Sequence, residues 1–168
     1  IDINDYYQWN PTLSYAPAEG VTFSRREVEL PGRPGEPKLQ GEVLLPAAAK
    51  RGPRPAALFL SGTGRQDRYG YAGPPPVDLG AHAITDALAE AGFVVLRFDE
   101  RGQGKSGEGP RSWDLQLEDA RRALRTLMVQ DEVDPDRIVL VGHGEGGWRA
   151  LELDGRVVLR QQLGGAAV

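Results

Sequence analysis

The sequence contains no cysteine, and methionine, histidine and aromatic residues are scarce. Without cysteine, the 168-residue chain can form no disulfide and offers no thiolate nucleophile. The formal charge of −4 provides no basic surface, so we expect neither a nucleic-acid partner nor a membrane partner. No apolar run reaches membrane-spanning length, and no signal-like segment stands at the start, which favours a cytoplasmic location.

What the chain does contain is typical of one folded domain. Hydrophobic residues make up 40% of the sequence and charged residues 26%, as in ordinary globular proteins. Residues 1–20 mix aromatic residues, polar residues and proline without periodicity, so we interpret them as an extended lead-in. Residues 21–168 then form the domain itself. Within it, residues 21–30 and 39–45 predict two strands, and the Pro/Gly-rich turn between them predicts an antiparallel hairpin.

From residue 56 onward, short apolar runs alternate with segments of helical periodicity. The runs at 56–60, 93–98 and 137–141 are typical of strands buried on both faces of a parallel sheet. Residues 77–91, 113–130 and those from Glu145 onward predict helices. This alternation predicts a doubly wound α/β fold with a mostly parallel sheet.

A glycine-rich turn, Gly142-His143-Gly144-Glu145-Gly146-Gly147, stands between the last strand and the last helix. That setting is typical of the nucleophile elbow Gly-x-Ser-x-Gly, where the strand and the helix approach too closely for side chains at the flanking positions. The central residue is Gly144, which has no hydroxyl group. Glycine tolerates the strained backbone of an elbow better than serine does.

Three ordered segments carry a family resemblance, namely residues 61–68, residues 98–106 and the glycine-rich turn. Together they resemble the α/β-hydrolase superfamily, and more narrowly its bacterial esterase and serine-aminopeptidase-like branch, over residues 39–150. The resemblance implies that Gly144 stands where the nucleophilic serine belongs. It also implies an oxyanion hole formed by the backbone of Glu145 and of the Gly62-Thr63 turn. The implied reaction is hydrolysis of an ester or small amide through acyl transfer to water, with no cofactor and no metal.

The other members of a catalytic triad are also missing. In this family the acid and then the histidine follow the elbow, but no histidine follows Gly147, and Asp154 comes too soon. His82 is interpreted as part of a solvated polar face with Asp86, and His143 is expected to pack beneath the elbow. We therefore expect the chain to be catalytically inactive as written. It is either a shortened serine hydrolase or a non-catalytic relative that binds a small ester or amide ligand, or a partner.

Five side chains are expected to shape the site rather than to react, and His143 is the first of them. Asp99 and Arg101 follow a strand at the edge where α/β proteins place functional groups, and the resemblance gives this segment a loop-shaping role. Asp67 and Arg68 are interpreted as an ion pair or a loop clamp at the mouth of the site.

Two nucleotide-binding motifs resemble parts of the sequence. Gly142-x-Gly144-x-x-Gly147 matches the dinucleotide fingerprint, but no acid follows Asp154 to bind a ribose, so this alternative ranks below the hydrolase. Gly104-Lys105-Ser106 lacks the earlier glycine of a phosphate-binding loop, because Asp99 stands at that position.

A sheet that ends just after the elbow helix leaves one strand edge unpaired. Because the predicted strands are too apolar to face water, we expect the C-terminally truncated domain to self-associate through that edge.

Overall fold

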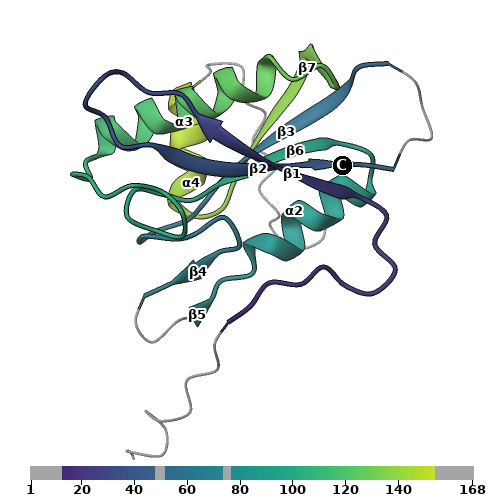
Figure 1. The fold of residues 1–168 in the computed structure, drawn as a ribbon, viewed down its shortest axis with the longest axis horizontal. Helices are drawn as coiled ribbons and strands as arrows, with labels where there is room; N and C mark the ends of the chain where they lie inside the picture. Colours follow the sequence, from purple (N-terminus) through teal and green to yellow (C-terminus); the bar gives the residue numbers. More distant parts are fainter. Residues whose placement is uncertain (1–12, 48–51, 74–76, 154–168) are drawn as a thin grey trace, which may run out of the picture.

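The computed structural model describes residues 13–47, 52–73 and 77–153. Their central element is a five-stranded sheet with the strand order β1-β2-β6-β3-β7 (Figure 1). Its strands are β1 (Ser24–Leu30), β2 (Leu39–Leu45), β3 (Arg54–Leu60), β6 (Val94–Phe98) and β7 (Val133–Gly142). β1 and β2 form the predicted antiparallel hairpin, and β3 pairs in parallel with both β6 and β7. Because β2 is also antiparallel to β6, it runs against the other four strands.

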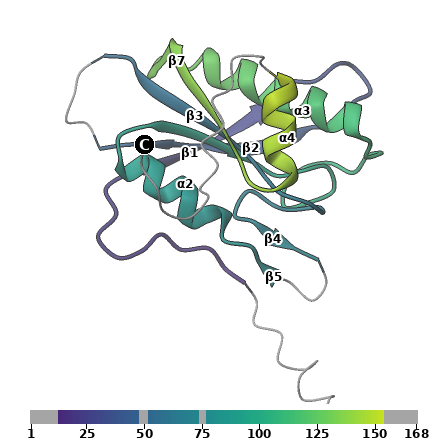
Figure 2. The same ribbon diagram turned by 180° about the vertical axis from the view of Figure 1, so that it is seen from behind.

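Helices cover both faces of this sheet, as the α/β prediction requires (Figures 1 and 2). Helix α2 (Ala81–Glu90) lies on one face, while α3 (Trp113–Met128) and α4 (Glu145–Leu153) lie on the other. Alternate residues of each central strand serve the two layers. On β6, for example, Leu96 packs with the α3 and α4 side and Val95 with the α2 side. The predicted α/β-hydrolase-type fold is confirmed.

Helix α3 shows how local sequence fixes an element. The Ser112 side chain caps its first turn by accepting a hydrogen bond from the Leu115 N–H at 3.3 Å. Leu117, Ala120 and Leu127 recur at helical spacing on the buried face. The apolar stripe therefore packs this helix against the sheet that carries the site.

The helix predicted over residues 77–91 begins later, at Ala81. Gly80 has a left-handed backbone with φ 77°, which a right-handed helix does not contain. Residues Val77–Asp78 instead form the short strand β5, which pairs with β4 (Tyr71–Ala72). The resulting β4–β5 hairpin stands between β3 and α2 in the sequence. Hydrophobic periodicity did not predict it.

The third buried strand was also predicted incorrectly in one respect. β7 is longer than residues 137–141 and is not buried on both faces, because Val139 is 45% exposed. The physical reason is its place at the edge of the sheet, where only β3 pairs with it among the described strands. Across the described residues, no helix is both long and apolar enough to cross a membrane.

Candidate active site

The carboxyl ends of β3, β6 and β7 meet at one edge of the sheet, near the β4–β5 hairpin and the start of α4 (Figure 1). The last residues of β3 and β7, Leu60 and Gly142, are paired in register. The loop after β3 also contacts the loop after β6, since the Ser61 hydroxyl donates to Glu100 Oε1 at 2.6 Å. The three predicted segments of the site therefore lie together.

The turn from β7 into α4 has the close approach of a nucleophile elbow. A β carbon on Gly142 would overlap the backbone of Gly146, and one on Gly146 would overlap the carbonyl oxygen of Leu60. Between them, Gly144 has a left-handed backbone with φ 53°. Both flanking glycines are therefore required by contact, and the central residue occupies the strained conformation that the sequence predicts.

Space remains at the central position for a side chain. A β carbon on Gly144 would lie 3.8 Å from the Gly62 Cα, which is ordinary van der Waals contact. Steric exclusion is therefore not what keeps a serine from this elbow. The cost of a larger residue here is that of its left-handed backbone alone.

The predicted oxyanion hole offers backbone donors with unused capacity. Gly146 N–H donates to the His143 carbonyl at 2.9 Å. By contrast, neither the Glu145 N–H nor the Thr63 N–H donates to another described residue. Such donors at a helix start can stabilise negative charge on a bound oxygen.

His143 does not pack beneath the elbow, so that expectation is wrong. Its residue is exposed, and its Nδ1 lies 2.9 Å from the point where a β carbon of Gly62 would be. The space beneath the turn is already filled by the contact between Gly146 and the Leu60 carbonyl. The imidazole therefore lies against the Gly62-Thr63 turn.

Asp99 joins the loop after β6 to neighbouring segments. Its carboxylate accepts from Arg68 at both Nε (3.0 Å) and Nη2 (2.8 Å), and from the Lys105 N–H at 2.9 Å. Burial lowers the pKa of Arg68, but hydrogen bonds and charge from Asp99 and Glu27 outweigh burial and raise it. Asp99 and Arg68 thus form a bidentate, nearly water-free pair that holds two loops together.

Asp67 and Arg68 do not form the ion pair that was one interpretation of them. The Asp67 carboxylate accepts the N–H groups of Tyr69 and Tyr71, each at 2.9 Å, while Arg68 turns to Asp99. Burial raises the pKa of Asp67. The alternative interpretation, a loop clamp, describes what Asp67 does for the β4–β5 hairpin.

Arg101 is directed away from the elbow, towards α3. It donates to Asp119 through Nε at 2.6 Å and through Nη2 at 2.8 Å. Asp119 also accepts from Arg122 at 3.3 Å, and Arg122 in turn donates to the Leu30 carbonyl at 2.7 Å. These contacts fix the loop after β6 to a helix and to the end of β1.

A buried charged pair at the centre of the site was not predicted from the sequence. Glu100 is 5% exposed and Arg149, on α4, is 1% exposed, and their side chains approach within 3.3 Å. Arg149 also donates to the carbonyl oxygen of Ser61. Burial raises the pKa of Glu100. One signal was available, since Arg149 stands one helical turn after Glu145 and faces the strand ends.

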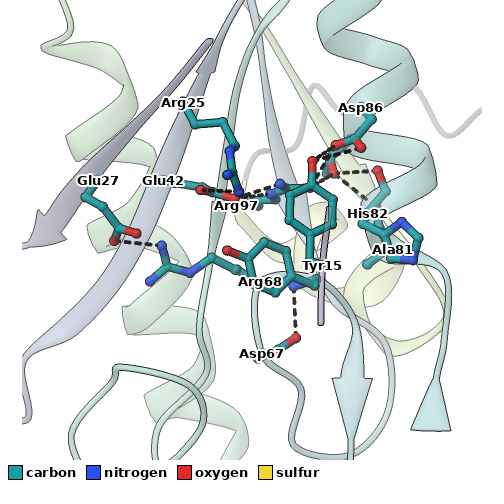
Figure 3. Close-up of polar contacts among 12 residues, drawn as sticks. Tyr15, Arg25, Glu27, Glu42, Asp67, Arg68, Ala81, His82, Asp86 and Arg97 are labelled. Carbon is teal, nitrogen blue, oxygen red and sulfur yellow. Dashed lines mark hydrogen bonds and ion pairs between the residues drawn. The ribbon is translucent and has the colours of Figure 1, made fainter. Parts of the chain in front are cut away.

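A second cluster joins Tyr15 of the lead-in to Arg97 on β6 and Asp86 on α2 (Figure 3). The Tyr15 ring stacks on that of Tyr69 at 4.4 Å between centroids, and the Tyr15 hydroxyl donates to Asp86. Asp86 also pairs with Arg97, so it is not the partner of His82 that the sequence suggested. His82 instead pairs with Asp78, the last residue of β5, at 2.9 Å. His82 therefore belongs to the support of the hairpin.

Within residues 13–47, 52–73 and 77–153, no three His, Cys, Asp or Glu side chains are grouped so that they could hold a metal ion. The arrangement instead combines unused backbone donors, a turn with room for a side chain, and buried ion pairs beneath it. Such a site can bind and polarise a carbonyl or carboxylate oxygen. Gly144 itself supplies no group that could attack one.

The sequence is similar to known hydrolases and to proteins related to them. The family model described as serine aminopeptidase, S33, matches residues 80–157. The protein YfhR of Escherichia coli K12 is 35% identical over 118 residues, 64% of this chain and 40% of that protein. NocK of Nocardia uniformis subsp. tsuyamanensis, whose name describes an esterase, is 29% identical over 82% of this chain and 38% of its own length. The chain thus spans about two fifths of the length of these relatives.

Solved structures show the same likeness in three dimensions. The hypothetical protein PA2218 of Pseudomonas aeruginosa superposes with a TM-score of 0.68 at 27% identity, covering 84% of this chain and 42% of that protein. The α/β hydrolase GrgF of Penicillium sp. sh18 gives 0.61 at 26% identity, covering 80% and 43%.

Proposed function

We propose that the chain is an α/β-hydrolase relative of the serine hydrolases that keeps the elbow but does not hydrolyse. The observation that carries this proposal is the elbow itself. Its flanking glycines make the required close contacts, and its central residue has the required left-handed backbone. That central residue is Gly144, so the scaffold presents no hydroxyl at the place where the chemistry begins.

The missing steps can be stated bond by bond. In a serine hydrolase, the serine oxygen bonds to the substrate carbonyl carbon while a histidine takes the hydroxyl proton. The carbonyl oxygen becomes an oxyanion held by backbone N–H groups, and the leaving group departs with the proton from that histidine. Here the N–H groups of Glu145 and Thr63 can serve the oxyanion, but no atom of Gly144 can form the first bond.

Neither described histidine replaces the missing base. His82 is paired with Asp78 beside the β4–β5 hairpin, and His143 lies against the Gly62 turn. No described carboxylate hydrogen-bonds to His143, so its ring lacks the acid that orients a catalytic base. We therefore propose that the 168-residue chain forms no acyl-enzyme. For the whole protein we propose descent from enzymes that hydrolyse esters or small amides without a cofactor.

A second candidate function is non-catalytic binding of a small ester, amide or carboxylate. It is favoured by the backbone donors of Glu145 and Thr63, which stay available although the nucleophile is absent. Both donors lie on the turns that flank the position of Gly144, where a β carbon would meet only the Gly62 Cα among residues beyond its chain neighbours. A ligand oxygen placed there would accept hydrogen bonds from the turn.

Two measurements on the same preparation test these proposals. The first follows nitrophenol release from 4-nitrophenyl acetate, and we expect no turnover above the background rate. Release that is proportional to protein concentration in independent preparations would contradict the inactive assignment. The second follows the amide resonances of Glu145 and Thr63 during titration with butyrate. Saturable shifts in both amides, with none in the β1–β2 hairpin, would support binding, and their absence would reject only the second candidate.

A further inference from the structure

A small cavity, lined mostly by buried side chains, lies between α3, α4 and the loop after β6. Its volume is about 10 Å³, and its lining includes Glu100, Arg111 and Arg149 together with Gln116 and Asp119. A single water molecule needs roughly 10–15 Å³ of such space, provided that polar partners surround it. The cavity is therefore of the size for one water and too small for an organic ligand.

Three polar atoms of this lining have no hydrogen-bond partner among the described residues. They are Glu100 Oε2, Arg149 Nε and Arg111 Nε. Glu100 and Arg149 are both more than nine-tenths buried. Leaving a buried charged group without a partner is costly, so native structures rarely do it. One acceptor and two donors without a partner thus belong to residues that line the same cavity.

The distances between these side chains also leave room for a bridging molecule. Arg111 Nη2 lies 3.6 Å from Glu100 Oε2 and 3.6 Å from Glu145 Oε1, which is too long for a direct hydrogen bond. Polar groups held at this separation are commonly bridged by water. By contrast, the other oxygen of Glu100 is fully engaged, accepting from Ser61 at 2.6 Å and from Arg149 Nη1 at 3.3 Å.

We propose that one buried water molecule occupies this cavity, donating to Glu100 Oε2 and accepting from Arg149 Nε–H and Arg111 Nε–H. Water fits because it both donates and accepts. An anion would lie against the Glu100 carboxylate, and a cation would lie between two guanidinium groups. The hydrated cluster joins the Ser61 turn after β3 to the elbow helix, because Glu100 and Arg149 both contact Ser61.

The water has a positioning role in this arrangement, since it touches no reacting atom. Glu100 and Arg149 belong to different elements and already share the direct contact of Arg149 Nη1 with Glu100 Oε1, and the bridging water adds a second link between the same two side chains. This holds whether or not the protein hydrolyses an ester, so failure of the proposed function would leave the water site unaffected.

The direct test is a crystal structure of the 168-residue chain in which ordered waters are resolved, collected with and without sodium bromide. We expect one density peak within hydrogen-bond distance of Glu100 Oε2 and Arg149 Nε, with no anomalous bromide signal. A direct hydrogen bond between these groups with no density between them would overturn the proposal. A bromide peak in the cavity would overturn it equally, because the ligand would then be an anion.

Solution measurements on variants test the positioning role. Glu100→Gln keeps an acceptor for the water, whereas Glu100→Leu removes it, and the exposed Glu108→Leu serves as the matched control. We expect amide exchange at Gly146 and Gly147 to rise at least about tenfold in Glu100→Leu and less than about threefold in the other two. Exchange in the β1–β2 hairpin should stay unchanged in all three. Equal exchange at the elbow in Glu100→Leu and Glu108→Leu would contradict the role.

A third measurement does not depend on a variant that folds. In the unsubstituted chain, the Arg149 Nε–H proton should show a direct cross-relaxation signal with a long-lived water. A protected Nε–H without such a signal would overturn the proposal.

Discussion

Arg97 lies fully buried against the ring of Tyr15, with its guanidinium carbon 4.5 Å from the ring centroid. The ring of Tyr69 lies nearby, 4.9 Å from the same carbon. Arg97 is also paired with Glu42 at 2.7 Å. Tyr15 therefore anchors the described part of the lead-in to the central strand β6, and burial raises the pKa of its hydroxyl to about 12.

Two substitutions separate the contribution of the Tyr15 hydroxyl to stability from that of its ring. Tyr15→Phe removes only the hydrogen bonds to Asp86 and should lower the free energy of unfolding by about 0.5–1.5 kcal/mol. Tyr15→Leu also removes the cation–π and stacking contacts and should lower it by about 2–4 kcal/mol. Urea denaturation measures both values. Equal losses in the two variants would show that the ring contributes nothing beyond its hydroxyl.

The buried pair of Arg68 and Asp99 gives a larger expected effect. Asp99→Asn removes the buried one of the two charged partners of the Arg68 guanidinium, which is 2% exposed and keeps only its contact with the half-exposed Glu27, and should cost about 3–5 kcal/mol. Glu108→Gln is the matched control, because its pair with Arg65 is long and its side chain is 80% exposed. We expect the control to change stability by less than about 0.5 kcal/mol. A loss at Asp99 no larger than that of the control would refute the clamp.

The pH dependence of stability should differ in sign between two glutamates. Burial raises the pKa of Glu100, so its contribution to stability falls as pH rises from the ordinary glutamate pKa to the raised one. Burial also raises the pKa of Glu27, but hydrogen bonds from Lys105 and Arg68 lower it overall. The contribution of Glu27 is therefore present above the ordinary pKa and is lost as pH falls through the lowered one.

The measurement compares the free energy of unfolding of the unsubstituted chain with that of each Gln variant, between about pH 3 and pH 7. The difference from Glu100→Gln should decrease as pH rises, and the difference from Glu27→Gln should increase. Slopes of the same sign would contradict the assignment of one group or the other.

We also expect the chain to self-associate through β7. No other described strand pairs with the outer edge of β7, and Val139 on it and Trp148 on α4 are 45% and 68% exposed. Free edges of this kind pair with other chains, and a charge on them opposes pairing. Val139→Lys should therefore shift the chain towards monomer in light scattering after size exclusion. Val129→Lys, exposed at the end of α3, should not. A monomeric unsubstituted chain would rule out the expectation.

The fold was largely predictable because its signals are local. Each central strand is a short apolar run, and α3 carries both a cap and an amphipathic stripe. The elbow was predictable for the same reason, since Gly142 and Gly146 mark a close approach along a few consecutive residues. The start of α2 was predicted incorrectly because Val77 fits the helical period of the residues that follow. The left-handed backbone of Gly80 nevertheless prevents the helix from extending back beyond Ala81.

Side-chain partners were not predictable because they join distant segments. Glu100 and Arg149 are separated by 49 residues, and Ser61 and Glu100 by 39. Charge type alone allowed Arg68 to pair with its neighbour Asp67, but the fold brings Asp99 to it across 31 residues. His143 was expected beneath the elbow because the sequence does not reveal that the Gly146 backbone fills that space.

Covalent labelling distinguishes an elbow that has lost its chemistry from one that still reacts. The 168-residue chain and its Gly144→Ser variant are each incubated with a fluorophosphonate, and the adducts are measured by intact mass. A serine fits at this position, with its β carbon 3.8 Å from the Gly62 Cα, but the neighbouring His143 has no hydrogen-bonded carboxylate among the described residues to orient it as a base. We expect no adduct on either protein. Stoichiometric labelling of the introduced serine in the variant, or of any residue in the unsubstituted chain, would contradict it.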